Sequence, residues 1–295
     1  MRVLICGGGV IGCSIAYFLS RRGADVTVIE STGIACAASG KSGGFLARDW
    51  CDGSPLSALA RRSFDLHAQL AAELPGDWGY RRLDTYAGFA SQRTPLRRFP
   101  GGYDLPWFSC DVAVSQAIGT PQTTAQVHPA QFTRAMMRAA EANGAEQRLG
   151  RVTGIAREGG RAIGVVVDGT IVKGDAVVIA MGPWSILAAQ WLTLPPVFGL
   201  KGHSLVFEAG DRLPAQAAFL ECQERSGAIL TPELFPRSDG TTYVCGISGE
   251  EALPVDPDTS LRTRGRSRGW RRCARASRRS SRRHRSWRVK RAIAR

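Results

Sequence analysis

The chain of 295 residues lacks several patterns that would place it in a common class. Its eight cysteines form no CxxC pair and no metal-ligand spacing, so no metal site is predicted and the thiols are expected to be reduced. No apolar run reaches the roughly 18 residues of a transmembrane helix. The first apolar run follows directly after Arg2, which leaves no room for a signal or transit peptide unless the start codon is misassigned. A cytoplasmic protein without membrane contact is therefore expected.

Acidic residues are absent from residues 260–295, which contain 16 Lys or Arg. Subtracting these 16 from the 39 basic residues of the chain leaves 23, against 25 acidic residues, so the rest of the chain has a net charge of −2. The tail is either an evolved basic arm that binds nucleic acid nonspecifically, or the product of out-of-frame translation of GC-rich coding sequence. The abrupt change after Pro257 favours the second interpretation. Both predict a disordered tail over 258–295 and no specific nucleic-acid partner.

The N-terminal residues carry the pattern of a dinucleotide-binding βαβ unit. An apolar run over 3–5 is followed at once by Gly7, Gly9 and Gly12 in the spacing GxGxxG, and Glu30 ends a second apolar run. In such a unit the first glycine permits a tight turn, the second lets the backbone approach a pyrophosphate, and the third lets the helix pack on the strand. The helix N-terminus attracts the phosphates, and the carboxylate binds a ribose. An adenine dinucleotide is therefore the predicted ligand.

A second run of small residues, ASGKSGGF over 38–45, comes soon after the fingerprint. Small residues allow the backbone to lie close to a large flat ligand, and they offer N–H groups to a phosphate. Lys41 could add a positive charge. Because this run follows the fingerprint so closely, a binding role is favoured over a flexible surface loop, and FAD is favoured over NAD.

With these motifs the chain resembles the D-amino-acid-oxidase family of FAD-dependent oxidoreductases, which includes glycine, sarcosine and D-amino-acid oxidases. The stretch 38–53 looks closest to a plant and fungal subgroup of FAD oxidoreductases. The resemblance covers residues 1 to about 257. Four further segments resemble parts of the family: VHPAQF (127–132), the strand at Val152, DAVVIAMGPWS (175–185) and FPRSDGTTYVCG (235–246).

The resemblance implies an α/β fold, in which a Rossmann-like FAD-binding domain carries a discontinuous, mostly β substrate domain. The FAD-binding domain would comprise residues 1–50 and 125–194, and the substrate domain residues 51–124 and 195–257. The motifs and the resemblance together predict these cofactor-binding residues: Gly7, Gly9, Val10, Ile11, Gly12, Glu30, Ser31, Ala38, Ser39, Gly40, Lys41, Gly43, Gly44, Phe45, Val152, Ala180, Gly182 and Trp184.

The resemblance also implies oxidation of a C–N bond in an amine or amino acid, with oxygen as the electron acceptor. No catalytic residue is predicted. Arg237 and Tyr243 are weak candidates for substrate binding, because Arg on a hairpin and Tyr in an alternating strand are more commonly surface and packing residues. Two C-terminal pieces of the family are missing, an Arg-bearing strand and a Gly-rich turn into a last helix. The chain as written is therefore expected to turn over weakly or not at all.

Two other functions remain open from the sequence. One is a catalytically silent nucleotide-binding protein with a basic nucleic-acid-binding arm, and the other is an NAD-linked dehydrogenase. Local patterns also make structural predictions that do not depend on function. They predict a helix starting at Ser54-Pro55, a strand over 80–91, an irregular segment over 92–125, a helix from Pro129 to Asn143 and mostly β structure over 195–247.

Overall fold

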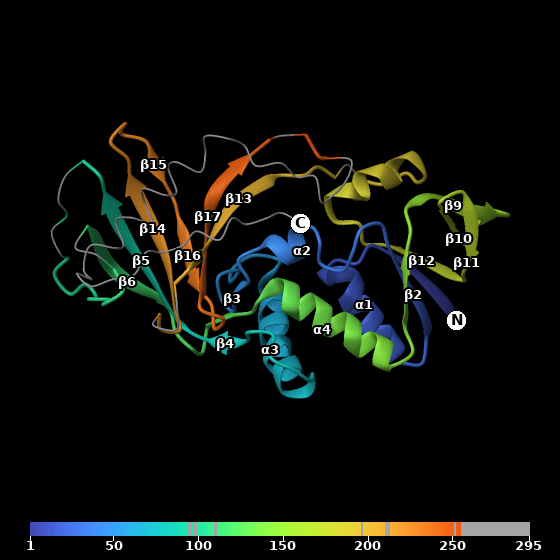
Figure 1. Ribbon diagram of the computed structural model, residues 1–295, viewed down its shortest axis with the longest axis horizontal. Coiled ribbons are helices and arrows are strands. Elements are labelled where there is room, and N and C mark those ends of the chain that lie inside the picture. The colour runs from blue at the N-terminus through green and yellow to red at the C-terminus, as the bar shows by residue number, and fades with distance from the viewer. Residues whose placement is uncertain are drawn as a thin grey trace.

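The computed structural model describes residues 1–93, 96, 99–108, 111–195, 197–209, 213–250 and 252–254. Figure 1 shows an elongated arrangement, with a helix-bearing part at one end and a broad β-sheet at the other. The predictions for the tail over 258–295 concern residues outside the described part of the chain, so they stay predictions.

A parallel sheet in the order β12–β1–β2–β8 forms the centre of the helix-bearing part. Alternate residues of β1 point to opposite faces of this sheet. Val3 and Ile5 belong to the core on the helix side, whereas Leu4 and Cys6 belong to the core on the other side. Because both faces are covered, the interior of β1 is apolar throughout. The strands are β1 (Arg2–Cys6), β2 (Asp25–Glu30), β8 (Glu146–Leu149) and β12 (Ala176–Ile179).

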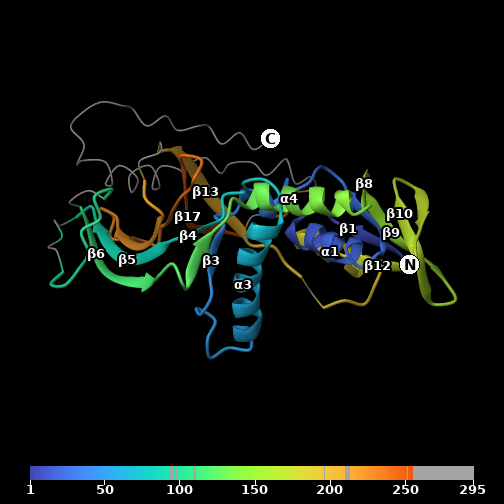
Figure 2. The ribbon, with the colours of Figure 1, turned by 90° about the horizontal axis from the view of Figure 1, so that it is seen from below.

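Helices α1 (Val10–Ser20) and α4 (Pro129–Ala142) lie side by side on one face of the parallel sheet (Figures 1 and 2). The predicted start and end of α4 are confirmed, since Pro129 is its first residue and Asn143 its C-cap. Proline suits this position because its missing N–H would have no helical partner there. The other face is covered by an antiparallel sheet of β9 (Val152–Glu158), β10 (Arg161–Val167) and β11 (Thr170–Lys173).

The third long helix, α3 (Ser57–Glu73), stands at a steep angle to α4 near one end of it (Figure 2), where the His67 ring lies 4.9 Å from that of Phe132. It begins later than the predicted Ser54-Pro55 start, because the hydroxyl of Ser54 accepts a hydrogen bond from the N–H of Leu56 in a preceding turn. Two short helical segments complete this part, α2 (Ala38–Lys41) and the 3₁₀ segment η1 (Gly182–Gln190).

The broad sheet is mixed, in the order β13–β17–β16–β14–β5–β6, with β15 paired to β14. Only β14 and β5 run parallel among its described pairs. The predicted β content of the C-terminal half is confirmed. The strands are β5 (Asp84–Ser91), β6 (Val112–Gly119), β13 (Lys201–Glu208), β14 (Gln216–Gln223), β15 (Ile229–Leu230), β16 (Glu233–Pro236) and β17 (Thr241–Gly249).

The prediction of an irregular segment over 92–125 is wrong, because this range contains β6 and most of β7 (Thr124–Gln126). The run VAVSQAIG of β6 does not alternate regularly, and β6 pairs with β5 through two register shifts. A strand of this kind is specified by its partner rather than by its own pattern. β7 also pairs with β3 (Phe45–Ala47) and β4 (Arg81–Arg82) in a small sheet between the two parts.

The core beneath the helices also includes residues that precede β4. Leu70 of α3, Leu74 and Trp78 pack in the same cluster as Val3 and Phe132. The domain boundaries stay a prediction, but this packing leads us to propose that α3 belongs with the FAD-binding domain rather than with the substrate domain.

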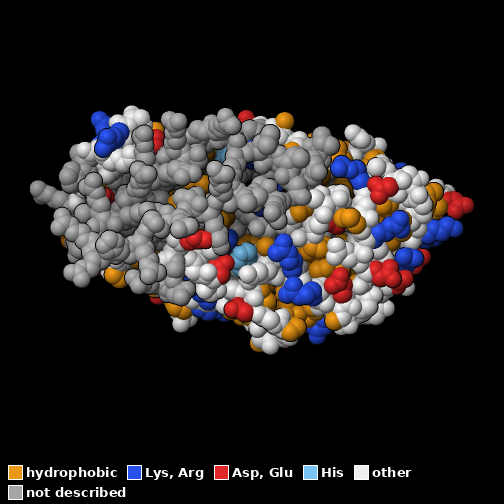
Figure 3. Space-filling view, in the orientation of Figure 1, with side chains coloured by type: hydrophobic (Ala, Val, Ile, Leu, Met, Phe, Trp, Pro, Cys, Tyr) orange, Lys and Arg blue, Asp and Glu red, His pale blue; other side chains and the backbone are white. Residues whose placement is uncertain are grey.

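Charged side chains of both signs are interspersed over the helix-bearing part on the face shown in Figure 3. This distribution agrees with the near-zero net charge of the chain before its tail. None of the helices in the described residues is both long enough and apolar enough to cross a membrane.

Candidate functional site

The turn between β1 and α1 is built by the predicted glycines. Gly7 has a φ of +117°, in the region that favours glycine. A Cβ on Gly7 would lie 2.3 Å from the carbonyl oxygen of Ala180, and a Cβ on Gly12 would lie 2.0 Å from that of Gly7. The close approach of β12, β1 and α1 therefore requires glycine at both positions. Gly9 is the N-cap of α1, whose first turn contains no acidic residue, so the helix itself leaves its positive end unneutralised.

The carboxylate of Glu30 lies beside this turn and is only 9% exposed. One oxygen accepts a 2.7 Å hydrogen bond from the N–H of Gly8, and the other accepts a 2.9 Å hydrogen bond from the N–H of Thr32. The oxygen bonded to Thr32, Oε1, also accepts longer bonds of 3.4 Å from the Ser31 hydroxyl and the Gly33 N–H. These contacts orient Glu30, and the acceptor capacity left for a ribose hydroxyl lies on Oε2, the oxygen bonded to Gly8. Gly8 was not predicted, because the x positions of GxGxxG are not constrained by the fingerprint.

A cavity of about 340 Å³ lies over the turn, and we call it the cofactor cavity. It is also lined by residues that were not predicted, among them Gly8, Cys36, Gly150, Arg151 and Met181. Trp184 is held in its wall by a 2.8 Å hydrogen bond from its indole N–H to the carbonyl oxygen of Pro254. The predicted residues that line it are Gly7, Gly9, Val10, Ile11, Glu30, Ser31, Ala38, Ser39, Val152, Ala180, Gly182 and Trp184.

The loop that includes α2 closes one side of the cofactor cavity. Ser39 reaches the start of α1, where its hydroxyl oxygen accepts a 2.8 Å hydrogen bond from the N–H of Val10. Gly40 packs so tightly that a Cβ would lie 1.8 Å from the carbonyl oxygen of Ala35. Ala35 itself has a φ of +62°, which L-residues rarely adopt, and it lines the cavity. No sequence pattern marks this conformation, so Ala35 was not predicted.

A second cavity of about 520 Å³ adjoins the first, and we call it the inner cavity. The two linings share Val10 and Ser39. The predicted residues Gly43, Gly44 and Phe45 line the inner cavity, whereas Gly12, Gly40 and Lys41 line neither of these two cavities. Its remaining lining residues are Ser42, Leu46, Trp50, His67, Val127, Pro129, Phe132, Thr133, Phe219, Glu233, Phe235 and Cys245.

Arg237 and Tyr243, the weak candidates for substrate binding, contact the loop rather than either of these cavities. The guanidinium of Arg237 donates a 2.9 Å hydrogen bond to the carbonyl oxygen of Ser42 and lies 5.0 Å from the centre of the Tyr243 ring. Burial lowers the pKa of Arg237. Both side chains therefore hold the loop against the broad sheet.

The residues of the cofactor cavity fit a dinucleotide. Gly9 leaves space at the turn that a side chain would fill, since a Cβ there would meet only the Ser39 hydroxyl, at 3.1 Å, and the positive end of α1 faces this space. Glu30 would bind the adenosine ribose, and the backbone near Val152 would contact adenine. Among the described residues, no three His, Cys, Asp or Glu side chains are grouped as a metal site would require.

A family model described as FAD dependent oxidoreductase (DAO) matches residues 2–288, and so extends past residue 257, where the sequence analysis expected the resemblance to end. The protein named "Putative oxidoreductase C1F5.03c" from Schizosaccharomyces pombe is 31% identical over 288 residues, which cover 88% of this chain and 74% of that protein.

Solved structures of bacterial oxidases share the fold. Glycine oxidase from Bacillus cereus is 24% identical, with a TM-score of 0.71, over 92% of this chain and 77% of that one. Iminodiacetate oxidase from Chelativorans sp. BNC1 is 20% identical, with a TM-score of 0.70, over 94% of this chain and 79% of that one. The predicted α/β fold with a Rossmann-like FAD-binding part is confirmed, and the family match excludes the NAD-linked alternative. The chain belongs to the family of FAD dependent oxidoreductases, and its cofactor is FAD.

Proposed function

We propose that this chain oxidises a C–N bond of a small amine or amino acid. The inner cavity is the observation that carries this proposal, because it adjoins the cofactor cavity at Val10 and Ser39 and lies against the broad sheet. A substrate there would be next to a cofactor that extends from the turn at Gly9. The names of the two similar bacterial oxidases, which refer to glycine and iminodiacetate, support the same substrate class.

The side chains and backbone of this chain would bind, orient and shield the reactants. Glu30 would fix the adenosine end of FAD, and the N-terminus of α1 would bind its pyrophosphate. Gly43 packs so closely on the sheet that a Cβ would lie 2.6 Å from the Phe235 ring. The lack of side chains at Gly43 and Gly44 would also let the backbone lie close to the flat flavin ring. Apolar walls would exclude water from the inner cavity. The bound flavin supplies the redox chemistry, taking two electrons from the substrate.

Oxygen is the proposed electron acceptor, and the experiment that tests the proposal measures both halves of the reaction. The full chain is purified, loaded with FAD and mixed without oxygen with glycine, sarcosine, D-amino acids and simple amines. Bleaching of the flavin absorbance by any of them supports the proposal, and recovery of the colour on admitting air supports oxygen as acceptor.

Absence of bleaching with every compound, together with firm FAD binding, would instead favour the catalytically silent nucleotide-binding protein. The sequence-based expectation that the chain as written turns over weakly or not at all also stays a prediction. The same experiment measures it through the rate of bleaching. The cytoplasmic location stays a prediction as well, which fluorescence microscopy of the tagged protein in its own cell would test.

A further inference from the structure

The inner cavity carries negative charge and no compensating basic side chain among its described lining residues. Its ionisable groups are His67, Glu233 and Cys245, and no Lys or Arg of the described residues lines it. Burial lowers the pKa of His67, so this imidazole is neutral near pH 7. Burial and the neighbouring Glu233 raise the pKa of Cys245, so its thiol is also neutral. Glu233 therefore supplies the carboxylate of this lining.

Glu233 faces the cavity because of strand pairing. It stands opposite Phe219 of β14 on one side and opposite Cys245 of β17 on the other, so the three residues form one row across the sheet. Phe235, two residues further along β16, lies on the same face and also lines the cavity. The thiol of Cys245 donates a 3.2 Å hydrogen bond to Glu233. This bond occupies one position of the carboxylate and leaves others for a ligand.

Aromatic rings surround this row. Phe45 lies opposite the sheet, with its ring centre 5.2 Å from that of Phe219 and 5.4 Å from that of Phe235. Trp50 lies 5.0 Å from both Phe45 and Phe219 and is 44% exposed. Phe235 stacks on both Phe45 and Tyr243, whereas Trp50 is partly exposed and keeps free ring surface. An aromatic ring face provides negative electrostatic potential without a formal charge and binds an ammonium group that lies near it.

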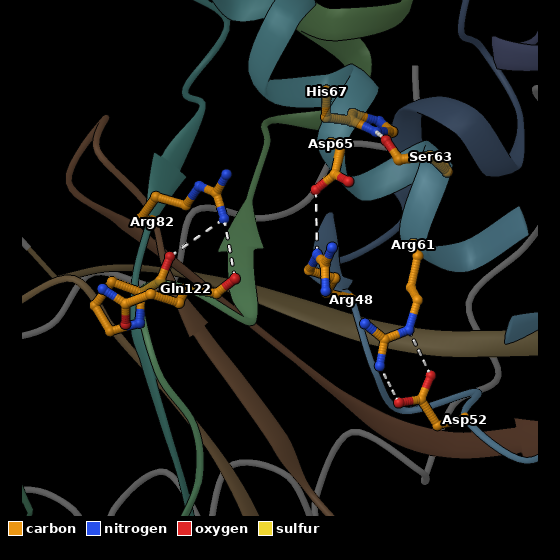
Figure 4. A network of polar contacts seen from close by, with 9 residues as sticks. Arg48, Asp52, Arg61, Ser63, Asp65, His67, Arg82 and Gln122 are labelled. Carbon is orange, nitrogen blue, oxygen red and sulfur yellow. Dashed lines mark hydrogen bonds and ion pairs between the residues drawn. The ribbon is translucent and has the colours of Figure 1, made fainter. Parts of the chain in front are cut away.

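The segment that bears Trp50 is held on both sides by ion pairs to α3, as Figure 4 shows. Arg48 is 3.2 Å from the carboxylate of Asp65, and Asp52 accepts a 2.9 Å hydrogen bond from Arg61. Such exposed pairs contribute little to stability, but they restrict the loop between them. Trp50 is thereby kept at the wall of the inner cavity.

A carboxylate on the ligand would find no cationic partner among the described residues of this lining. Its negative charge would meet Glu233 at short range, and the clamp considered from the sequence, Arg237, binds Ser42 and the Tyr243 ring instead. Like charges in a partly desolvated site repel strongly. An organic cation, in contrast, would gain both a charged hydrogen bond and contacts with the aromatic faces.

We propose that the inner cavity selects an amine in its ammonium form, without a carboxylate on the adjacent carbon, through Glu233 and the aromatic wall formed by Phe45, Trp50 and Phe219. This inference rests on the proposed function and narrows it from amines and amino acids to amines alone.

The test compares each amine with the amino acid that carries one extra carboxylate. The pairs are benzylamine with phenylglycine, isobutylamine with valine, and dimethylamine with sarcosine, with both enantiomers of the chiral amino acids. Binding to the FAD-loaded full chain is followed without oxygen through the flavin spectrum and the tryptophan fluorescence. Each amine is expected to bind at least about tenfold more tightly than its partner, the scale of one hydrogen bond to a charged group. Tighter binding of the amino acids, or no binding of any amine, would overturn the proposal.

The variant Glu233→Gln keeps the shape of the side chain and removes its charge. It is expected to lower the affinity for the amines at least about tenfold and to leave the affinity for the amino acids unchanged or slightly higher. The affinity for FAD is expected to stay unchanged. The matched control is Glu158→Gln, an exposed glutamate at the end of β9 outside both cavities. Equal amine affinity in Glu233→Gln and the control would contradict the assignment of Glu233.

Benzyl alcohol provides a comparison that needs no variant, because it matches benzylamine in shape and lacks the charge. Benzylamine is expected to bind more tightly, and equal binding would contradict recognition of a cation. The proposed function fails separately from this inference. If amines bind with the expected preference and none of them bleaches the flavin, the proposed oxidase function is contradicted. The proposed recognition of an ammonium group by the inner cavity is then still supported.

Discussion

The hydroxyl of Tyr243 donates a 2.9 Å hydrogen bond to the carbonyl oxygen of Lys41. This bond joins β17 of the broad sheet to the end of α2, residues that are 202 positions apart in the chain. The loop after Lys41 carries the glycines of the inner cavity, so the bond couples the position of that loop to the sheet. The Tyr243 ring also stacks with Phe235, with an angle of 13° between the ring planes.

The variant Tyr243→Phe keeps the stacked ring and loses only the hydroxyl. We expect a loss of about 1 kcal/mol in the free energy of unfolding, the usual contribution of one hydrogen bond. Burial raises the pKa of Tyr243 to about 12, so the hydroxyl is protonated and can donate throughout the neutral range. Urea unfolding followed by tryptophan fluorescence measures the change. Tyr103→Phe, at a ring that is 46% exposed, is the control and is expected to have no effect.

The proposed dinucleotide contacts predict two defects in FAD binding. Glu30→Ala removes the charged acceptor, and it should weaken binding by about 1–3 kcal/mol, which corresponds to the loss of a hydrogen bond to a charged group. Gly9→Val should nearly abolish binding, because a side chain would occupy the place of the pyrophosphate. Quenching of FAD fluorescence on titration gives the affinities.

The control for both is Gly202→Val, since a Cβ on Gly202 would meet no atom within 4 Å. It should leave FAD affinity unchanged. Wild-type affinity in both Gly9→Val and Glu30→Ala would mean that the dinucleotide does not bind at this turn.

Thiol labelling should separate the cysteines by environment. Burial raises the pKa of both Cys6 and Cys13 to about 12, and both side chains are fully buried. Since only the thiolate reacts, labelling of these two thiols by a disulfide reagent at pH 8 should be slower by a factor of roughly a thousand than that of an ordinary thiol, even before access is considered. Among the cysteines that the structure describes, mass spectrometry should find the label first on the partly exposed Cys51. Equal labelling of Cys6 and Cys51 in the folded protein would contradict their placement.

Acid should destabilise the fold through two partly buried histidines. Burial lowers the pKa values of His67 and His128 below the ordinary 6.5. The unfolded chain therefore takes up these protons first as the pH falls below 6.5, and the free energy of unfolding declines until the lowered pKa of the folded state is reached. Urea unfolding between pH 7.5 and 5.5 should show this decline. His67→Gln should show a smaller decline, and an identical pH dependence would mean that His67 titrates normally in the fold.

Structural features that depend only on residues close together in the sequence could be predicted from the sequence alone. The turn at Gly7, Gly9 and Gly12 is specified by neighbours within one βαβ unit, so spacing alone predicts it. The start of α4 at Pro129 is similarly local, because proline fits the first turn of a helix and little else in one.

The inner cavity could not be predicted in the same way. Glu233 lies in its lining only because β16 pairs with β14 and β17, and nothing near Glu233 in the sequence specifies those partners. Ala35 adopts its unusual φ because the surrounding loop packs tightly, with Gly40 against its carbonyl group. Such features depend on contacts between distant segments, which a single sequence does not reveal.

The strand order β12–β1–β2–β8 also sets the sequence of events during synthesis. β1 is made first, yet one of its edges stays unpaired until residues 176–179 have been made and pair with it. The nascent chain must therefore keep an apolar strand from associating with other chains while well over half of the described protein is translated. Because contacts of such long range form slowly, early folding should depend on the local unit of β1, α1 and β2, and chaperones would find their binding site at the open edge of β1.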